Sequence, residues 1–300
     1  MKVIILGKGE MLANLIEGTL LSGAEIVGVM RYEKLFKTRI RLLWDDLCQS
    51  NPALTLMKKN NINDINLKSA NSESFKNLIV NNNIDIVLVG TWAEKIRKEI
   101  FNAPTIGTIN VHPSLLPKYR GPNPYLQAIW HGETHSGITF HLMSEEFDAG
   151  NILAQARIKI YEQDTGKELR TKTTTTAKFL CAELLKDLQS GCVVPTPQDE
   201  KLASYYTEIA PQDMTLNFAK ETAKEILLHV RAFHPFRPTY IQERNDFWIV
   251  NPYKVFITEQ SGMPCEIIKK SKSEIQICAK DGIALSFKDI KKYNRLFKFI

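Results

Sequence analysis

The segment that decides the fold reads Thr108-Ile109-Asn110-Val111-His112-Pro113-Ser114-Leu115-Leu116-Pro117-Lys118-Tyr119-Arg120-Gly121. Its apolar beginning predicts a short β-strand, which Pro113 ends because proline has no N–H to donate to a sheet. Asn110 and His112 are two residues apart, so on a strand their side chains point to the same face. The segment therefore aims an amide and an imidazole at one place.

A second segment predicts a neighbouring strand. Residues Gly137 to Met143 alternate between polar and apolar side chains, which is typical of a strand with one buried face. The loop that follows, Ser144 to Gly150, contains Asp148 shortly before a glycine. An amide, an imidazole and a carboxylate on neighbouring strand ends suit acyl-type chemistry on a carbonyl group.

These residues resemble the signature of a known family. The pattern Asn-x-His-x-Ser-Leu-Leu-Pro-x-x-Arg-Gly, followed by an Asp-x-Gly loop, is similar to that of the folate-dependent formyltransferases. Because the pattern fixes many positions in one loop, it is more specific than a single short motif. The resemblance implies 10-formyltetrahydrofolate as the formyl donor and catalysis by Asn110, His112 and Asp148.

The three residue types fit the attack of an amine on a formamide-like carbonyl. Asn110 offers an N–H donor that does not titrate, which suits stabilisation of the developing oxyanion. His112 titrates near neutral pH and can hold or move a proton. Asp148 either orients the imidazole and stabilises its charged form, or keeps it cationic as a second oxyanion donor; both alternatives stay open here.

The resemblance also implies a folate pocket. Its matching loop is Ser114, Leu115, Leu116 and Pro117, where backbone groups can pair with the polar edge of a pterin while leucine side chains cover its faces. By position, two further segments resemble the other walls of the pocket through their backbone groups: Glu94, Lys95 and Ile96, and Ser144, Glu145, Glu146 and Phe147.

The chain before this segment predicts an α/β fold with a mainly parallel, doubly wound, Rossmann-like sheet. Val3 to Leu6 is the continuous apolar run of a buried parallel strand, and Gly7-Lys8-Gly9 turns from it into a helix. Further strands are predicted at 25–30 and 84–90, separated by helical patterns. Leu12 stands where the third glycine of the dinucleotide fingerprint would fall, so NAD binding has little support.

The composition of the chain changes after about residue 190. Residues 1–190 are expected to form the formyltransferase catalytic domain, and the Pro-rich polar stretch 191–203 a linker. Residues 204–300 contain one helical pattern and then short alternating segments with turns between them, which predicts a small β-barrel. In the branch of the family that acts on methionyl-tRNA, an OB-like barrel follows the catalytic domain, and Arg231 to Phe236 is similar to its signature.

Composition bounds the class of protein. The chain has 300 residues, of which 44% are hydrophobic and 24% charged, and its formal net charge is +6. These values are typical of a globular protein and mildly favour anionic partners. The five cysteines are scattered without a metal-binding spacing, so we expect reduced thiols, no metal and a cytoplasmic location. No apolar run is long enough to cross a bilayer, so no membrane partner is expected.

The formyl acceptor is less determined than the donor. The resemblance favours the amino group of methionyl-tRNA, with a sugar-nucleotide N-formyltransferase acting on a nucleotide-linked amino sugar as the alternative. A catalytically idle binding protein and a formyl-folate hydrolase are further alternatives. The segment from Arg31 to Asp46 holds five cations and no Gly or Pro. It is either an acceptor-binding flap or a solvated amphipathic helix.

Overall fold

The computed structural model describes residues 1–35 and 51–293. Its contacts divide the chain into two compact units. The first contains residues 1–121, 136–158 and 171–205, and the second contains 122–135, 159–170 and 206–300. Most of the predicted segment from Arg31 to Asp46 lies outside the described residues.

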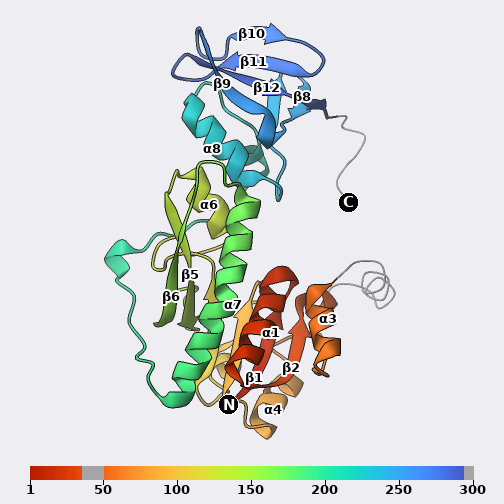
Figure 1. The fold of residues 1–300 in the computed structure, drawn as a ribbon, viewed down its shortest axis with the longest axis vertical. Helices are drawn as coiled ribbons and strands as arrows, with labels where there is room; N and C mark the ends of the chain where they lie inside the picture. Colours follow the sequence, from red (N-terminus) through yellow and green to blue (C-terminus); the bar gives the residue numbers. More distant parts are fainter. Residues whose placement is uncertain (36–50, 294–300) are drawn as a thin grey trace. The chain divides into compact units, whose positions relative to one another are not determined.

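A six-stranded sheet organises the first unit, in the order β2-β1-β3-β4-β5-β6 (Figure 1). The strands are β1 (Lys2–Gly7), β2 (Glu25–Arg31), β3 (Ile86–Gly90), β4 (Gly107–His112), β5 (His135–Leu142) and β6 (Ile152–Lys159). Strands β1 to β4 are parallel to one another, as the continuous apolar runs predict. Strand β5 pairs with β4 in the antiparallel direction. The fold is therefore Rossmann-like and mostly parallel, and β5 is the departure that matters for the site.

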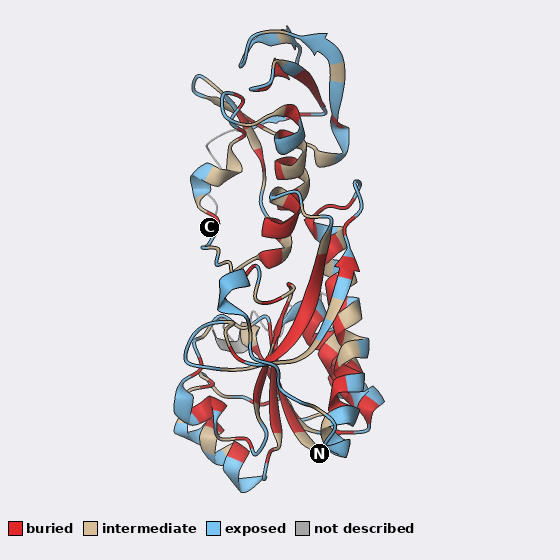
Figure 2. Cartoon of the chain, turned by 90° about the vertical axis from the view of Figure 1, so that its left-hand side faces the viewer, coloured by how far each residue is buried: buried red, intermediate tan, exposed pale blue. Residues whose placement is uncertain are grey.

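Helices cover both faces of this sheet. They are α1 (Gly9–Ser22), α3 (Pro52–Lys59), α4 (Glu73–Asn81), α5 (Lys98–Phe101) and most of α7 (Gly166–Ser190). Phe75 and Ile79 of α4 pack with Val87 and Val89 of β3 in one buried cluster. On the opposite face α1 lies so close to β3 that a Cβ atom at Gly90 would be 2.7 Å from the Leu15 side chain. Figure 2 shows the strands of the sheet as mostly buried and the outer helix surfaces as exposed.

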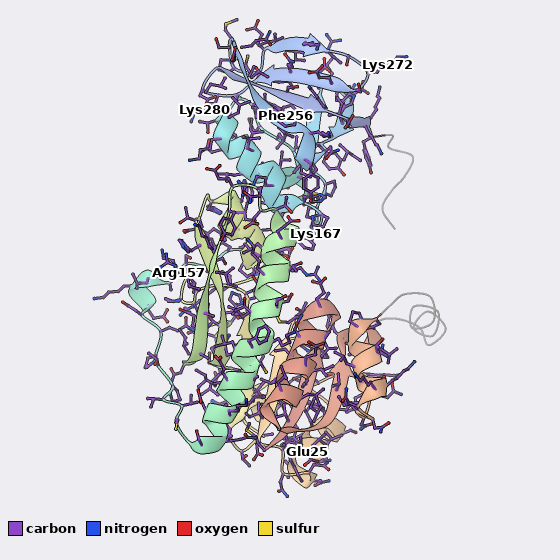
Figure 3. All side chains as sticks on the ribbon, in the orientation of Figure 1. Glu25, Arg157, Lys167, Phe256, Lys272 and Lys280 are labelled. Carbon is purple, nitrogen blue, oxygen red and sulfur yellow. The ribbon has the colours of Figure 1, made fainter. Side chains whose placement is uncertain are left out.

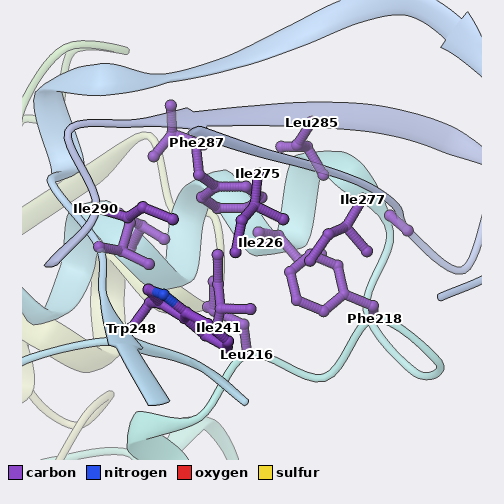
Figure 4. Close-up of a cluster of buried hydrophobic side chains, with 14 of the residues drawn as sticks. Leu216, Phe218, Ile226, Ile241, Trp248, Ile275, Ile277, Leu285, Phe287 and Ile290 are labelled. Carbon is purple, nitrogen blue, oxygen red and sulfur yellow. The ribbon is translucent and has the colours of Figure 1, made fainter. Parts of the chain in front are cut away.

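The second unit has its own hydrophobic core. It contains α6 (Pro124–Trp130), α8 (Ala223–Phe233) and two antiparallel sheets, ordered β10-β11-β12-β9 and β13-β8-β7. Ile226 of α8 packs on Ile241, Trp248 and Phe287 from the two sheets (Figure 4). Where the sequence predicts a small β-barrel at the C-terminal end, the structure thus has an antiparallel β-domain. The remaining strands are β7 (Tyr240–Glu243), β8 (Asp246–Ile249), β9 (Val255–Ser261), β10 (Ile267–Lys270), β11 (Glu274–Cys278), β12 (Ile283–Lys288) and β13 (Lys291–Lys292).

Short 3-10 helices complete the described elements, at η1 (Tyr32–Leu35), η2 (Glu200–Leu202), η3 (Pro211–Met214) and η4 (Pro252–Lys254). η2 lies inside the stretch that the sequence predicts as a linker. No helix within residues 1–35 and 51–293 combines the length and apolar character that a membrane span requires.

Candidate active site

Two neighbouring strands present four polar side chains on one face. In the β4–β5 ladder Asn110 stands opposite His141, and His112 stands opposite Thr139. Residues directly opposite each other on an antiparallel pair share a face, and so do residues two apart on one strand. His112, Thr139 and His141 are buried, and Asn110 is half-buried. The predicted pairing of Asn110 with His112 therefore lies on a largely buried surface.

The carboxylate reaches this surface from a loop that doubles back. Because β5 runs antiparallel to β4, it ends beside the beginning of β4. A loop that continued straight past the end of β5 would place Asp148 far from His112. The loop is closed where Leu142 N donates to Asn151 O at 2.9 Å. Asp148 has φ 56°, in the left-handed region that Asp tolerates better than most residues. The carboxylate thus arrives by loop return, and not from a neighbouring parallel strand end.

One oxygen of Asp148 is the meeting point of the site. Its Oδ1 lies 3.2 Å from Asn110 Nδ2, 3.4 Å from His112 Nδ1 and 3.7 Å from His141 Nε2. The other oxygen, Oδ2, accepts from the backbone N–H of Gly121 at 2.9 Å. The structure therefore brings together the three residues that the sequence proposes for catalysis.

The pKa values of Asp148 and His112 are shifted by burial and by the groups that surround each side chain. Burial alone would raise the pKa of Asp148, but His112, His141 and the Gly121 N–H outweigh it and lower the pKa to about 2. Burial lowers the pKa of His112, while Asp148 and the Tyr119 carbonyl oppose that effect. At neutral pH Asp148 is therefore an anion beside an imidazole that burial biases towards its neutral form.

Hydrogen-bond partners determine which atoms face each other. An ionised carboxylate only accepts, so the atom of Asn110 beside Asp148 is its NH2 nitrogen. His112 Nε2 lies 2.8 Å from the Tyr119 carbonyl oxygen, to which it donates, because a carbonyl has no proton to give. The neutral His112 ring thus keeps its Nδ1 lone pair on the side of Asp148, where it can receive a proton.

Two residues from the predicted linker brace the loop of Asp148. Gln198 Nε2 donates to the carbonyl oxygens of Asp148 and Gly150, both at 2.8 Å. Its Oε1 accepts from Arg120 Nη2 at 2.8 Å, and Arg120 also pairs with Glu200 at 2.7 Å. Arg120 is buried, with 7% of its surface exposed, so its observed contacts are those of a structural brace.

The predicted folate loop has a well-defined conformation. Ser114 Oγ donates to Lys118 O at 2.7 Å, and Leu116 N donates to Thr139 Oγ1 at 3.3 Å. Leu116 is buried, while Leu115 and Pro117 are half-buried. The loop is thus tied to the β5 strand that carries His141.

The other predicted walls have different surroundings. Glu94 accepts from Ala70 N at 3.0 Å and from Asn71 Nδ2 at 3.1 Å, and Ile96 is buried in the core. The Lys95 ammonium lies 5.2 Å from the ring centre of Phe147, and Glu145 pairs with Lys98. Ser144 Oγ donates to the carbonyl oxygen of Glu146 at 2.8 Å. These side chains mostly join the two segments to each other and to residues 70 and 71, which is compatible with the predicted roles for their backbone groups.

Sequence reasoning missed two residues of the site, His141 and Gln198. His141 had a signal, since it alternates with Thr139 on the predicted strand next to Asn110 and His112. Gln198 had none, because its partners are 48 and 50 residues away in the chain.

Comparison with known proteins gives matches over most of the chain. The formyl transferase family model matches residues 1–185, and the model of the formyl transferase C-terminal domain matches residues 208–295. A methionyl-tRNA formyltransferase of Lactiplantibacillus plantarum is 32% identical over 210 residues, which are 69% of this chain and 66% of the relative. The one from Geobacillus thermodenitrificans is 36% identical over 55% of this chain and 51% of its own length. The matched regions thus span about half to two thirds of the curated relatives.

Solved structures show the same fold at lower identity. An N-formyltransferase from Helicobacter canadensis, in complex with folinic acid and dTDP-3-aminofucose, aligns with a TM-score of 0.68 at 20% identity, over 98% of this chain and 100% of its own. HypX from Aquifex aeolicus, in complex with tetrahydrofolic acid, aligns with a TM-score of 0.65 at 18% identity, over 98% of this chain and 45% of its own. At such identities the similarity concerns the fold.

Proposed function

The chain belongs to the formyl transferase family, and from that premise we propose that it moves a formyl group from 10-formyltetrahydrofolate to the amino group of methionyl-tRNA. The observation that carries the proposal is the convergence of Asn110, His112 and His141 on one carboxylate oxygen of Asp148. The names of the curated relatives support methionyl-tRNA as the acceptor, and that acceptor implies a cytoplasmic reaction.

In the proposed reaction the amine nitrogen bonds to the formyl carbon, and the carbonyl oxygen becomes an oxyanion. Collapse of this intermediate breaks the bond between that carbon and N10 of the folate. The amine loses one proton, and N10 takes one up. His112 receives the proton at Nδ1 and returns it to the leaving nitrogen, while Asp148, 3.4 Å away, stabilises the imidazolium that exists in between.

Asn110 is the proposed donor to the oxyanion. Its Nδ2 lies 3.2 Å from Asp148 Oδ1 and 3.1 Å from His141 Nε2, so its two hydrogens face these two groups. The hydrogen on the His141 side is shared with the formyl oxygen as negative charge develops there. A neutral donor already held in place stabilises the transition state without reorganisation, which is why such donors are effective.

We also propose the position of the folate and the division of the chain. The pterin would lie against Ser114 to Pro117, with backbone groups of 94–96 and 144–147 forming the other walls. Residues 1–190 would form the catalytic domain, 191–203 the linker and 204–300 the C-terminal OB-like domain. The two family matches, which end at residue 185 and begin at residue 208, support this division.

A transfer assay tests the proposal. Purified protein and 10-formyltetrahydrofolate are offered methionyl-tRNA and, separately, a panel of nucleotide-linked amino sugars, and formylated product is measured by mass spectrometry. The expected result is formyl-methionyl-tRNA, and none with the Asp148→Asn variant purified in the same way. Formylation of a sugar alone would refute the acceptor, and release of formate without transfer would indicate a hydrolase.

A further inference from the structure

His141 is the group in the site with no assigned role. It lies in β5 opposite Asn110, and 2% of its surface is exposed. Its Nε2 is 3.1 Å from Asn110 Nδ2 and 3.7 Å from Asp148 Oδ1, so its nearer polar neighbour is the amide. Its Nδ1 is 2.9 Å from the carbonyl oxygen of Leu142.

The contact at Nδ1 points to one tautomer of the neutral His141 ring. The Leu142 carbonyl can only accept, so Nδ1 carries the proton and donates it. In the neutral ring Nε2 is then an acceptor, and the NH2 group of Asn110 is the donor it faces. The backbone of the next residue therefore prepares His141 to hold one hydrogen of the Asn110 amide.

Asn110 needs this second acceptor because Asp148 is shared. Asp148 Oδ1 lies 3.2 Å from Asn110 Nδ2 and 3.4 Å from His112 Nδ1. When His112 takes up a proton, its contact with Asp148 becomes a charge-assisted hydrogen bond, which is the stronger of the two. The hydrogen bond from the Asn110 amide to Asp148 then weakens at the step in which the NH2 group must still point into the site.

We propose that His141 is a positioning residue that holds the Asn110 carboxamide, with its NH2 group directed into the site, through an acceptor independent of Asp148. The inference rests on the proposed formyl transfer, because Asn110 is the group whose orientation that reaction requires. His141 itself touches no reacting atom in this scheme.

Two substitutions with side chains of similar length test whether His141 acts by holding the Asn110 amide or only by filling space. Gln offers a side-chain oxygen that can accept from Asn110, whereas Met offers no comparable acceptor. His141→Met should lower kcat about tenfold, the effect of one hydrogen bond, with KM for the folate unchanged. His141→Gln should restore most of kcat, and His135→Gln on the same strand is the control. Equal losses in the Gln and Met variants would overturn the proposal.

A double-mutant cycle tests whether His141 acts through Asn110. If it does, Asn110→Ala combined with His141→Met should be no slower than Asn110→Ala alone, because the held group is already gone. A merely structural role would instead slow the double variant by the same factor as the single His141→Met. That additive result would contradict the proposal.

A spectroscopic measurement is independent of turnover. The ¹⁵N chemical shifts of the imidazole in the wild-type protein should show a proton on Nδ1 of His141 and none on Nε2. The side-chain amide signals of Asn110 should move in His141→Met and stay near their original positions in His141→Gln. A proton on Nε2 would refute the inference even in an active enzyme. An inactive wild-type protein with the predicted spectra would refute only the proposed formyl transfer.

Discussion

At the scale of single residues, Asn110 carries the sharpest kinetic prediction. Asn110→Ala removes the proposed donor to the oxyanion, and loss of one such donor typically costs ~10²–10³ in kcat. We expect this fall with unchanged affinity for the folate, measured by steady-state kinetics and by direct binding. Asn102→Ala, at an exposed position of the same unit, is the control. A normal rate in Asn110→Ala would remove this residue from the mechanism.

The lowered pKa of Asp148 leads to a prediction about how the stability of the fold depends on pH. Its pKa falls from the ordinary 3.8 to about 2 in the folded chain, because favourable partners outweigh burial. The folded protein thus binds this proton less readily than the unfolded chain, so the carboxylate stabilises the fold above pH ~4 and this contribution is lost as the pH falls through ~2. Nearly two pKa units correspond to ~2 kcal/mol.

Urea unfolding of Asp148→Asn checks that value. We expect the variant to be less stable than the wild type by ~2 kcal/mol at pH 7, with the gap closing below pH ~3. A gap that stays constant with pH would mean that the charge of Asp148 contributes nothing, and that the substitution acts through packing.

At the scale of elements, a local capping signal predicts the start of α4. Serine favours the N-cap position, so Ser72 before the helical pattern predicts a helix start, and in the structure its Oγ accepts from Phe75 N at 3.2 Å at the start of α4. Ser72→Ala should lower the free energy of unfolding by ~1 kcal/mol, the usual value of an N-cap. Ser74→Ala, at an exposed position inside the same helix, should be neutral or slightly stabilising because alanine favours helices. Equal effects of the two substitutions would contradict the capping role.

The loop that carries Asp148 depends on the absence of a side chain at Gly150. A Cβ atom there would lie 1.8 Å from the carbonyl oxygen of Leu142, which is backbone and cannot turn aside. Gly150→Ala should therefore cost about 1–3 kcal/mol and displace Asp148. Activity should fall together with the melting temperature, and a fully active, equally stable variant would show that the loop adjusts freely.

Elements whose signals are local were predictable, and those set by distant partners were not. The apolar run Val3 to Leu6 predicts β1, because buried parallel strands are apolar on both faces. The pattern from Ala93 to Phe101 predicts a short helix, but this length is wrong, since only Lys98–Phe101 is helical and Glu94 bonds to residues 70 and 71 instead. Apolar residues at helical spacing predict a long helix from Lys172 to Ser190, and in the structure this helix begins earlier, at Gly166.

The site shows the same division. Spacing on one strand pairs Asn110 with His112, and the family pattern adds Asp148. The alternation of the predicted neighbouring strand is a signal for His141, but the antiparallel direction of β5 is a property of chain topology, so the return of the loop could not be predicted. Gln198 illustrates the limit, because nothing local in a Pro-rich polar stretch indicates that its side chain holds the Asp148 backbone 50 residues away.

At the scale of the whole molecule, the positive charge of the chain is relevant to which formyl acceptor it binds. The chain carries a formal net charge of +6, and residues 204–300 contribute lysines such as Lys272 and Lys280 on exposed positions (Figure 3). Phe256 is 48% exposed, and the Lys288 ammonium lies 6.0 Å from its ring centre. Cations beside an exposed aromatic ring suit a polyanion that offers phosphates and bases.

Salt dependence of binding turns this charge into a prediction. A protein that neutralises several phosphates releases their counterions, so affinity for tRNA should fall on the order of 10²–10³-fold between about 50 and about 200 mM salt for about five contacts. A nucleotide-linked sugar has only two phosphates and should show a shallow dependence by the same reasoning. Fluorescence titrations with methionyl-tRNA over a salt series measure the slope.

Phe256→Ala should weaken tRNA binding at every salt concentration while leaving the slope unchanged, because the ring carries no charge. Replacement of Lys288 by Ala should reduce the slope itself. A flat salt dependence in a protein that still transfers formyl groups would mean that the acceptor is small and that the basic surface serves another purpose.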